Sequence, residues 1–533
     1  MLLHRVKKRC LRKLASAQVL TSGMGTVAIA TVLSCVASPA DAASLTFDPN
    51  DLVVSRSVYQ GTAATVTVGQ PLPGGGTATN NGLYPNVFNN EKPDASFGVT
   101  SPIFIDQITT SGQNAGTVSI DPTLITTSFP SKSELALNLT PDGTGLTFMG
   151  YSTGINQLDV SNSNTPGIIE PGNPVTTNPT YRAVGQLNYD NSLQVTTTNA
   201  YPGNNGRAAI LAPNGLYYTV GNGGNGNGSA AVTNATGVQI VTPGQKATAA
   251  TPGTTPVGQY NITQNGYPAD KTAKDNNFRG ETIYNNTLYT TKGSGSNGIN
   301  SVYQIGQAGT LPNPANAANT PISILPGFAT NLARSPVAGA QNNPFGIWFA
   351  NPNTLYVTDE GNDATTAAGG IASNNVYGGL QKWSLVNGTW VQDYVLQGGL
   401  QLGNNYTVVD PVTGNTYTTA TAGLRNLTGK VNSDGTVSLY AVTSTISNAT
   451  DQGADPNKLV AITDNLSNTT AAQAASEQFN VIDNAKYGEV LRGVSFAPSK
   501  PVPEPVTILG SVMAMGIGGL MKKKYAQKLR VGG

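Results

Sequence analysis

The sequence repeats a pair of short strands at a nearly constant interval. In each copy an apolar segment is followed by a turn and then by an aliphatic and aromatic segment, as in 345–350 with 354–358. The first segments begin near residues 134, 207, 279, 345, 424 and 491, so successive copies lie 66 to 79 residues apart. A period this steady predicts repeated supersecondary units.

Each unit has room for four strands. The clearest further pair is 380–385 and 389–395, joined by Asn387-Gly388, a strong hairpin signal. Four strands per unit indicate a propeller blade. We therefore predict an all-β protein, a β-propeller of six blades, with seven blades as the alternative.

The last copy, 491–497, has no second strand after it. Segments 51–58, 102–108 and 117–120 can complete its blade, so strands from both termini would close the ring. The competing folds are a parallel β-solenoid and tandem β-sandwiches. A solenoid repeats at about 20 to 30 residues, and independent sandwiches would not leave half a unit at each end, so we favour the propeller.

The units are longer than a four-stranded blade requires. Of the 533 residues, 62 are Gly and 33 are Pro, while charged residues make up only 11%. The surplus is concentrated in Gly-, Asn-, Thr- and Pro-rich stretches at 221–228, 243–258 and 313–342, which we interpret as long loops. Such loops either build binding sites on propeller faces or serve as neutral surface.

The first 42 residues have the pattern of a secretory signal peptide. Six basic residues lie between 5 and 13, an apolar stretch covers 19–36, and Ala40-Asp41-Ala42 provides a small-residue cleavage site. An N-terminal membrane anchor and lipidation at Cys35 are alternatives. His4, Cys10 and Cys35 all lie in this segment, so cleavage excludes His- or Cys-dependent nucleophilic catalysis, His- or Cys-ligated metal and disulfides from the mature protein.

The last 33 residues, 501–533, have three parts in order: Val502-Pro503-Glu504-Pro505, an apolar run at 506–521, and a basic cluster. The basic residues are Lys522, Lys523, Lys524, Lys528 and Arg530. This tail resembles the PEP-CTERM sorting signal of Gram-negative envelope proteins. The resemblance implies processing by an exosortase-type transpeptidase, a transient inner-membrane helix, and an association with exopolysaccharide or biofilm.

Both termini therefore indicate export. The positive-inside tendency would keep the basic cluster cytoplasmic and place residues 43–500 on the periplasmic side, before delivery to the outer envelope or the extracellular matrix. Without the two ends the chain has a net charge of about −8. We find no basic patch in this core and expect no binding to nucleic acid.

One set of charged residues recurs at matching positions. Basic residues stand at the start of four first strands and an acidic residue at the start of another: Arg207, Arg279, Arg425, Arg492 and Glu134. Since first strands line the channel of a propeller, these side chains would ring one mouth of the tunnel and could bind an anion or an acidic sugar. The alternative is that each Arg pairs with the neighbouring blade and holds the ring together.

A second candidate site is an acidic loop that follows a strand, with Asp359, Glu360 and Asp363 as candidate ligands for calcium. The loop lacks EF-hand spacing, and a solvated acidic loop is the competing interpretation. We expect a propeller scaffold that binds polysaccharide, with no catalytic residues assigned. The alternative is a metal-dependent propeller enzyme, of lactonase, phosphatase or lyase type, with Glu134 or Glu281 as additional ligands or bases.

Overall fold

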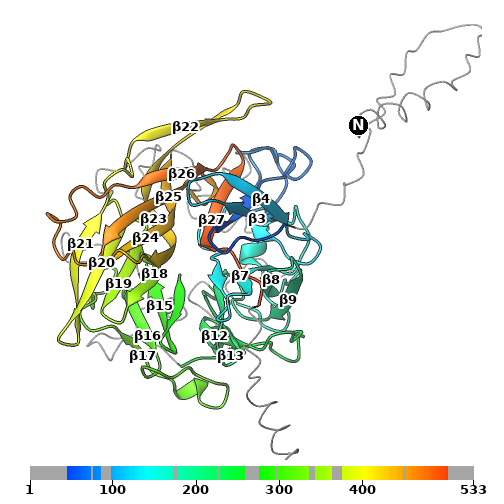
Figure 1. Cartoon of the computed structure of the whole chain (residues 1–533). Helices are drawn as coiled ribbons and strands as arrows, with labels where there is room; N and C mark the ends of the chain where they lie inside the picture. Colours follow the sequence, from blue (N-terminus) through cyan, green and yellow to red (C-terminus); the bar gives the residue numbers. More distant parts are fainter. Residues whose placement is uncertain are drawn as a thin grey trace, which may run out of the picture. The chain divides into compact units, whose positions relative to one another are not determined.

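The computed structural model describes residues 45–73, 76–85, 98–171, 178–224, 229–258, 275–293, 297–334, 342–362, 375–447 and 452–501. Within these residues the protein is all-β, and six small sheets form the blades of a six-bladed β-propeller (Figure 1). The predicted fold and blade number are confirmed. The predicted signal peptide and all parts of the predicted sorting tail after residue 501 lie outside the described residues.

The first blade joins the two ends of the described chain. Its innermost strand is β27 (Glu489–Phe496), followed outward by β1 (Leu52–Val58), β3 (Ile103–Ile108) and β4 (Asn114–Ser119). All three pairings are antiparallel, with Val53 opposite Ser495 and Ile105 opposite Val118. The predicted closure by strands from both termini is therefore confirmed.

Four blades follow in chain order, each with its first strand innermost. Blade 2 consists of β6 (Asn138–Leu139), β7 (Gly145–Tyr151), β8 (Arg182–Asn188) and β9 (Leu193–Thr198), and blade 3 of β10 (Gly206–Leu211), β11 (Tyr217–Gly221), β12 (Gly237–Val241) and β13 (Thr255–Pro256). Blade 4 consists of β14 (Glu281–Tyr284), β15 (Thr287–Lys292), β16 (Ser301–Ile305) and β17 (Ile322–Ile324). Blade 5 consists of β18 (Pro344–Asn351), β19 (Thr354–Asp359), β20 (Gly379–Val386) and β21 (Thr389–Leu396).

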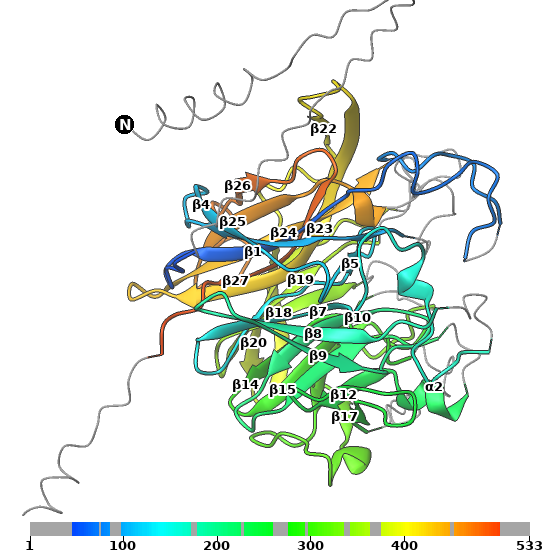
Figure 2. The ribbon, with the colours of Figure 1, turned by 90° about the vertical axis from the view of Figure 1, so that its right-hand side faces the viewer.

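The sixth blade has an extra strand. Its sheet runs β22 (Asn405–Val409), β23 (Thr416–Val431), β24 (Thr436–Ser447), β25 (Lys458–Asn465) and β26 (Asn480–Asn484). The later part of the 16-residue β23 serves as the inner strand, while its start pairs with β22 in a hairpin that projects from the blade (Figure 2). This hairpin, absent from the sequence prediction, explains why the interval between 345 and 424 is the longest.

The described elements outside the blades are short. A two-stranded sheet pairs β2 (Thr100–Ser101) with β5 (Thr127–Ser128), and the helical pieces are α2 (Ala230–Asn234), η2 (Val160–Asn162), η4 (Ala317–Asn319) and η5 (Gln452–Ala454). In the part of the chain that the structure covers, no helix has the length and apolarity needed to cross a membrane.

The residues of one turn explain a hairpin that was predicted, and one stretch that was predicted as a loop contains secondary structure. Asn387 and Gly388, between β20 and β21, both adopt positive φ, 50° and 79°, as a two-residue turn of type I′ requires. By contrast, the stretch 313–342, predicted as a loop, contains η4 and the outer strand β17. Only Ile322, Ser323 and Ile324 form that strand, which is too short to stand out among Pro, Asn and Ala.

The hydrophobic core is divided among the six seams between neighbouring blades. Each seam buries apolar side chains from both of its blades. One pair from each, in ring order from the seam between blades 1 and 2, is Val53 with Phe148, Met149 with Ala209, Tyr218 with Leu288, Val302 with Leu355, Leu380 with Leu439, and Val442 with Leu491. Burial of these faces is the main force that holds the ring.

A polar link also crosses several seams near the axis. Ser55 Oγ accepts the N–H of Gly493 in its own blade at 2.7 Å and donates to the carbonyl of Leu135 in the next blade at 2.7 Å. Thr291 and Thr358 make the same link in the seams between blades 4 and 5 and between blades 5 and 6. Each link satisfies two buried backbone groups that the sheets leave unpaired.

Candidate functional site

The six inner strands surround a central cavity of about 280 Å³. Every blade contributes to its wall, since β6, β10, β14, β18, β23 and β27 all supply lining residues. The polar side chains of the wall belong to Asn138, Glu281, Thr282, Asn426, Thr428 and Ser495, and the larger apolar ones to Leu137, Leu139, Ile210, Ile283, Ile347, Trp348, Leu427 and Phe496. The mixture provides hydrogen-bonding groups beside apolar surface, the usual composition of a small-molecule site.

The most unusual residue of this wall is Glu281. It is the first residue of β14, opposite Thr290 in β15, and only 5% of its surface is exposed. Neither carboxyl oxygen has a hydrogen-bond partner among the described residues. Burial raises the pKa of Glu281 well above its ordinary value, so the neutral acid is favoured. A neutral carboxyl group can both donate and accept a hydrogen bond, which suits a hydroxyl group of a ligand.

Two of the predicted tunnel-mouth arginines converge on one hydroxyl group. Arg207 Nε donates to Ser133 Oγ at 2.8 Å, and Arg279 Nη1 donates to the same oxygen at 2.7 Å. Arg207 also donates to the carbonyl of Phe278, in the segment before the next blade. The guanidiniums of blades 3 and 4 are therefore brought together, but through contacts that tie blades 2, 3 and 4 to one another.

The other two arginines are equally enclosed. Arg425 Nε forms an ion pair with Glu360 at 3.0 Å, which links blade 6 to the segment that follows β19 in blade 5. Arg492 Nη2 donates to the carbonyls of Phe129 and Gly453. All four predicted arginines are at most 9% exposed. Their described contacts are those of the alternative interpretation, in which the arginines join segments of the ring.

Glu134 lies apart from the arginine contacts described above. Its carboxyl group is fully buried and accepts hydrogen bonds from Thr127 Oγ1 at 2.8 Å, the N–H of Ser128 at 3.0 Å, and the hydroxyl of Tyr151. Burial raises its pKa, against the effect of these donors. The carbonyl of Leu135, the next residue, accepts the hydroxyl of Ser55 across its seam, just as the carbonyl of Arg425 accepts the hydroxyl of Thr358. Glu134 is thus one residue out of register with the arginines.

The predicted calcium ligands also have protein partners. Asp359, at the end of β19, accepts the N–H groups of Gly361 and Asn343 at 2.9 and 3.1 Å and Gln381 Nε2 at 3.2 Å. Glu360 holds Arg425, and Asp363 lies outside the described residues. Within the described ranges, no three Asp, Glu, His or Cys side chains are grouped so that they could hold a metal ion. Calcium binding stays a prediction.

Sequence reasoning named Glu281 only as an alternative base or ligand, and it gave Trp348 no binding role. The structure places both in the wall of the cavity. Asn426 and Thr428 were missed, although they follow Arg425 by one and three residues. Their spacing could have predicted them, because the residues after each inner-strand arginine continue along the same channel-lining strand.

Comparisons with known proteins identify no family for this chain. No protein-family model matches it, and no curated protein matches it either. Among solved structures, the hemagglutinin-neuraminidase ectodomain of parainfluenza virus 5 is 11% identical over 75% of this chain and 77% of that chain, with a TM-score of 0.31. A polysaccharide lyase of family PL25, an ulvan lyase, is 11% identical over 82% and 97%, with a TM-score of 0.27.

Proposed function

We propose that this protein is an exported polysaccharide-binding protein of the cell envelope or extracellular matrix, and that the central cavity of its propeller holds one sugar unit. The observation that carries the proposal is a central cavity walled by all six blades, whose lining residues include Glu281, with a carboxyl group buried beside the cavity and unpartnered among the described residues. A buried polar group without a partner destabilises a fold, so its presence in a cavity favours a ligand that completes its hydrogen bonds.

The chemistry of the wall supports a small, uncharged, hydroxyl-rich ligand. At about 280 Å³ the cavity is near the lower end of ligand sites, which span roughly 300 to 1,000 Å³. The Nδ2 groups of Asn138 and Asn426 donate to the carbonyls of Ala209 and Arg492 at 3.0 and 2.6 Å, so these two residues offer their amide oxygens. Ser495 offers a hydroxyl group, and Trp348 offers apolar surface. The carboxyl group of Glu281, neutral when buried, suits a sugar hydroxyl group better than an acidic group.

The test is a binding survey of the purified protein against monosaccharides and exopolysaccharides, followed by calorimetry of each ligand found. We expect Glu281→Leu to weaken binding by about tenfold or more, because a ligand hydroxyl group loses its carboxyl partner. Glu170→Leu is the matched control, since Glu170 is also fully buried but does not line the cavity. A protein that binds no sugar, or equal affinity in Glu281→Leu, would refute the proposal.

The export part of the proposal rests on the sequence patterns at the two ends. We propose that an exosortase-type transpeptidase reads Val502-Pro503-Glu504-Pro505 while residues 506–521 anchor the chain in the inner membrane. The test is the mass of the protein recovered from the envelope and the medium of the producing cells. The expected product lacks residues 1–42 and the basic tail, and Glu504→Ala should retain the tail in the membrane fraction.

A further inference from the structure

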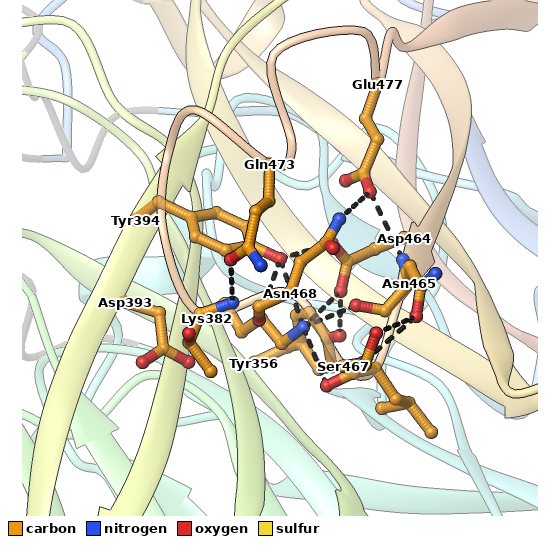
Figure 3. A network of polar contacts seen from close by, with 12 residues as sticks. Tyr356, Lys382, Asp393, Tyr394, Asp464, Asn465, Ser467, Asn468, Gln473 and Glu477 are labelled. Carbon is orange, nitrogen blue, oxygen red and sulfur yellow. Dashed lines mark hydrogen bonds and ion pairs between the residues drawn. The ribbon is translucent and has the colours of Figure 1, made fainter.

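A buried lysine and a buried aspartate face each other across the seam between blades 5 and 6 (Figure 3). Lys382 lies on β20 and Asp464 on β25, and both side chains have no exposed surface. Lys382 Nζ is 2.9 Å from Asp464 Oδ2. A pair held this closely, without solvent access, is in the geometry from which an amine and a carboxyl group can react.

Two tyrosine hydroxyl groups donate to the Asp464 carboxyl group. Tyr356 donates to Oδ2, and Tyr394 donates to Oδ1 at 2.5 Å. Lys382 Nζ is held in turn by Tyr394 and by the carbonyls of Asn465 and Leu466, at 3.0, 2.8 and 3.3 Å. Donors aimed at both carboxyl oxygens withdraw charge from Cγ and would stabilise a negative oxygen formed when a nucleophile adds to it.

A second carboxyl group lies near the pair. Glu477 belongs to the segment between β25 and β26. Its Oε1 accepts Asn468 Nδ2 at 2.9 Å and the N–H of Asn465 at 3.2 Å. Burial and the neighbouring Asp464 carboxyl group raise the pKa of Glu477 to about 7.

We propose that Lys382 and Asp464 condense to an isopeptide bond that covalently joins blades 5 and 6, with the Tyr394 hydroxyl group as the group that transfers the proton. This hydroxyl accepts from Lys382 Nζ at 3.0 Å and donates to Asp464 Oδ1 at 2.5 Å, so it bridges the two reacting groups. One proton first passes from the ammonium group to the carboxylate, which leaves a neutral amine and a neutral acid.

The condensation then balances without any further reactant. The Nζ lone pair forms a bond to Cγ, and the π electrons of the carbonyl move to oxygen. Tyr394 Oη accepts a proton from Nζ and passes its own proton to the hydroxyl group on Cγ. The Cγ–O bond breaks, one water leaves, and the carbonyl re-forms. The product is a neutral secondary amide, and the Tyr394 hydroxyl group is restored to its initial state.

A covalent link at this place would suit an exported chain that cannot form disulfides. Once residues 1–42 are removed, no cysteine remains, because Cys10 and Cys35 are the only two in the sequence. The bond would close a loop from 382 to 464, which includes the whole of the projecting β22–β23 hairpin. Such a link would restrict the unfolded chain in the way that a disulfide does.

The test is peptide mapping of the purified, fully denatured protein by trypsin digestion and mass spectrometry. We expect cleavage after Lys382 to be blocked, since its amine is acylated. Residues 335–425 should then appear as one piece, joined to the tryptic peptide 459–486 that contains Asp464 and lighter than the sum of the two by one water. Complete cleavage after Lys382, with no joined peptide, would overturn the proposal and leave an ordinary buried ion pair.

Three variants separate the chemistry from the fold. Tyr394→Phe should fold but give at least tenfold less joined peptide, and an unchanged yield would overturn the role of Tyr394. Asp464→Asn should give a joined peptide of the same mass as the wild type, because the amide then loses ammonia in place of water. Lys458→Met, in the same strand as Asp464, is the matched control and should leave the joined peptide intact.

Discussion

Asp464 and Glu281 are both buried carboxyl groups of this propeller, but their surroundings differ completely. Asp464, in the seam between blades 5 and 6, has Lys382 at 2.9 Å and two tyrosine donors. Glu281, in the central cavity, has no hydrogen-bond partner among the described residues. The seam therefore provides partners for its buried acid, whereas a partner for Glu281 would have to come from outside the described residues.

The largest effect should come from removing the partnered acid. We expect Asp464→Ala to lower the free energy of unfolding by about 3–5 kcal/mol, because it leaves the Lys382 amine buried without its ionic or covalent partner. Urea-induced unfolding of the purified variant measures this loss. Asp434→Ala is the control, since Asp434 only supports an exposed turn through Thr436, and its loss should change stability by about 1 kcal/mol or less. Equal losses in the two variants would contradict the comparison.

An intermediate case is Asp455, which is buried with hydroxyl partners alone among its described hydrogen bonds. It accepts hydrogen bonds from Tyr417, Thr419 and Ser447, yet burial raises its pKa from 3.8 to about 6. The folded protein therefore binds this proton more tightly than the unfolded chain does. The resulting stability is fully present below pH 3.8 and is lost as the pH rises through about 6.

The two pKa values of Asp455 correspond to about 2 kcal/mol between pH 4 and pH 7. We expect Asp455→Asn to lack this contribution, so its advantage over the wild type should grow as the pH rises. Unfolding free energies of both proteins at the two pH values measure the difference. An identical pH dependence would show that Asp455 keeps an ordinary pKa. Asp359, whose pKa burial also raises to about 6, remains in both proteins and cancels.

The hydroxyl link in the same seam as Asp464 should have a smaller effect. Thr358 accepts the N–H of Gly346 at 2.6 Å and donates to the carbonyl of Arg425. Thr358→Val keeps the shape but leaves both backbone groups without a partner, and we expect a loss of about 1–3 kcal/mol. Thermal and urea unfolding measure it. Ser55→Ala should lower the free energy of unfolding by a similar amount, through the seam between blades 1 and 2. If neither variant changes stability, apolar burial alone holds the ring.

The smallest effect on stability should follow loss of the lone acid. We expect Glu281→Leu to change the free energy of unfolding by less than about 1 kcal/mol, in the stabilising direction, because no described hydrogen bond is broken and a desolvated carboxyl group is removed. The same variant should lose sugar binding. A loss of several kcal/mol on urea unfolding would mean that Glu281 has a structural partner, and the contrast with Asp464 would fail.

Much of the fold could be predicted because its signals are local. The strand pair at 345–358, the Asn387-Gly388 turn and the half-units at the two ends each follow from residue type and spacing, and together they specify a closed ring of six blades. The short outer strand β17 and the β22–β23 hairpin were missed. Strand β17 is only Ile-Ser-Ile and β22 is Asn-Tyr-Thr-Val-Val, both in turn-rich surroundings, and neither shows a distinctive period.

The candidate site was predictable only in part. The repeated arginines were located correctly on or beside inner strands, but their partners, such as Ser133 and Glu360, come from segments whose approach no local pattern reveals. Glu134 shows the limit well. In the sequence it stands beside the strand start, while in the structure a shift of one residue turns it toward Tyr151.

The sequence by itself determined the repeat, the blade number and the closure of the ring, because strand periodicity and turn residues act over a few neighbouring positions. Only the tertiary structure decided which buried acid has partners and which has none. Lys382 and Asp464 are 82 residues apart in the chain, and the cavity around Glu281 is assembled from six separate strands. Such environments depend on how whole blades pack against one another, and packing is a property of the ring rather than of any segment.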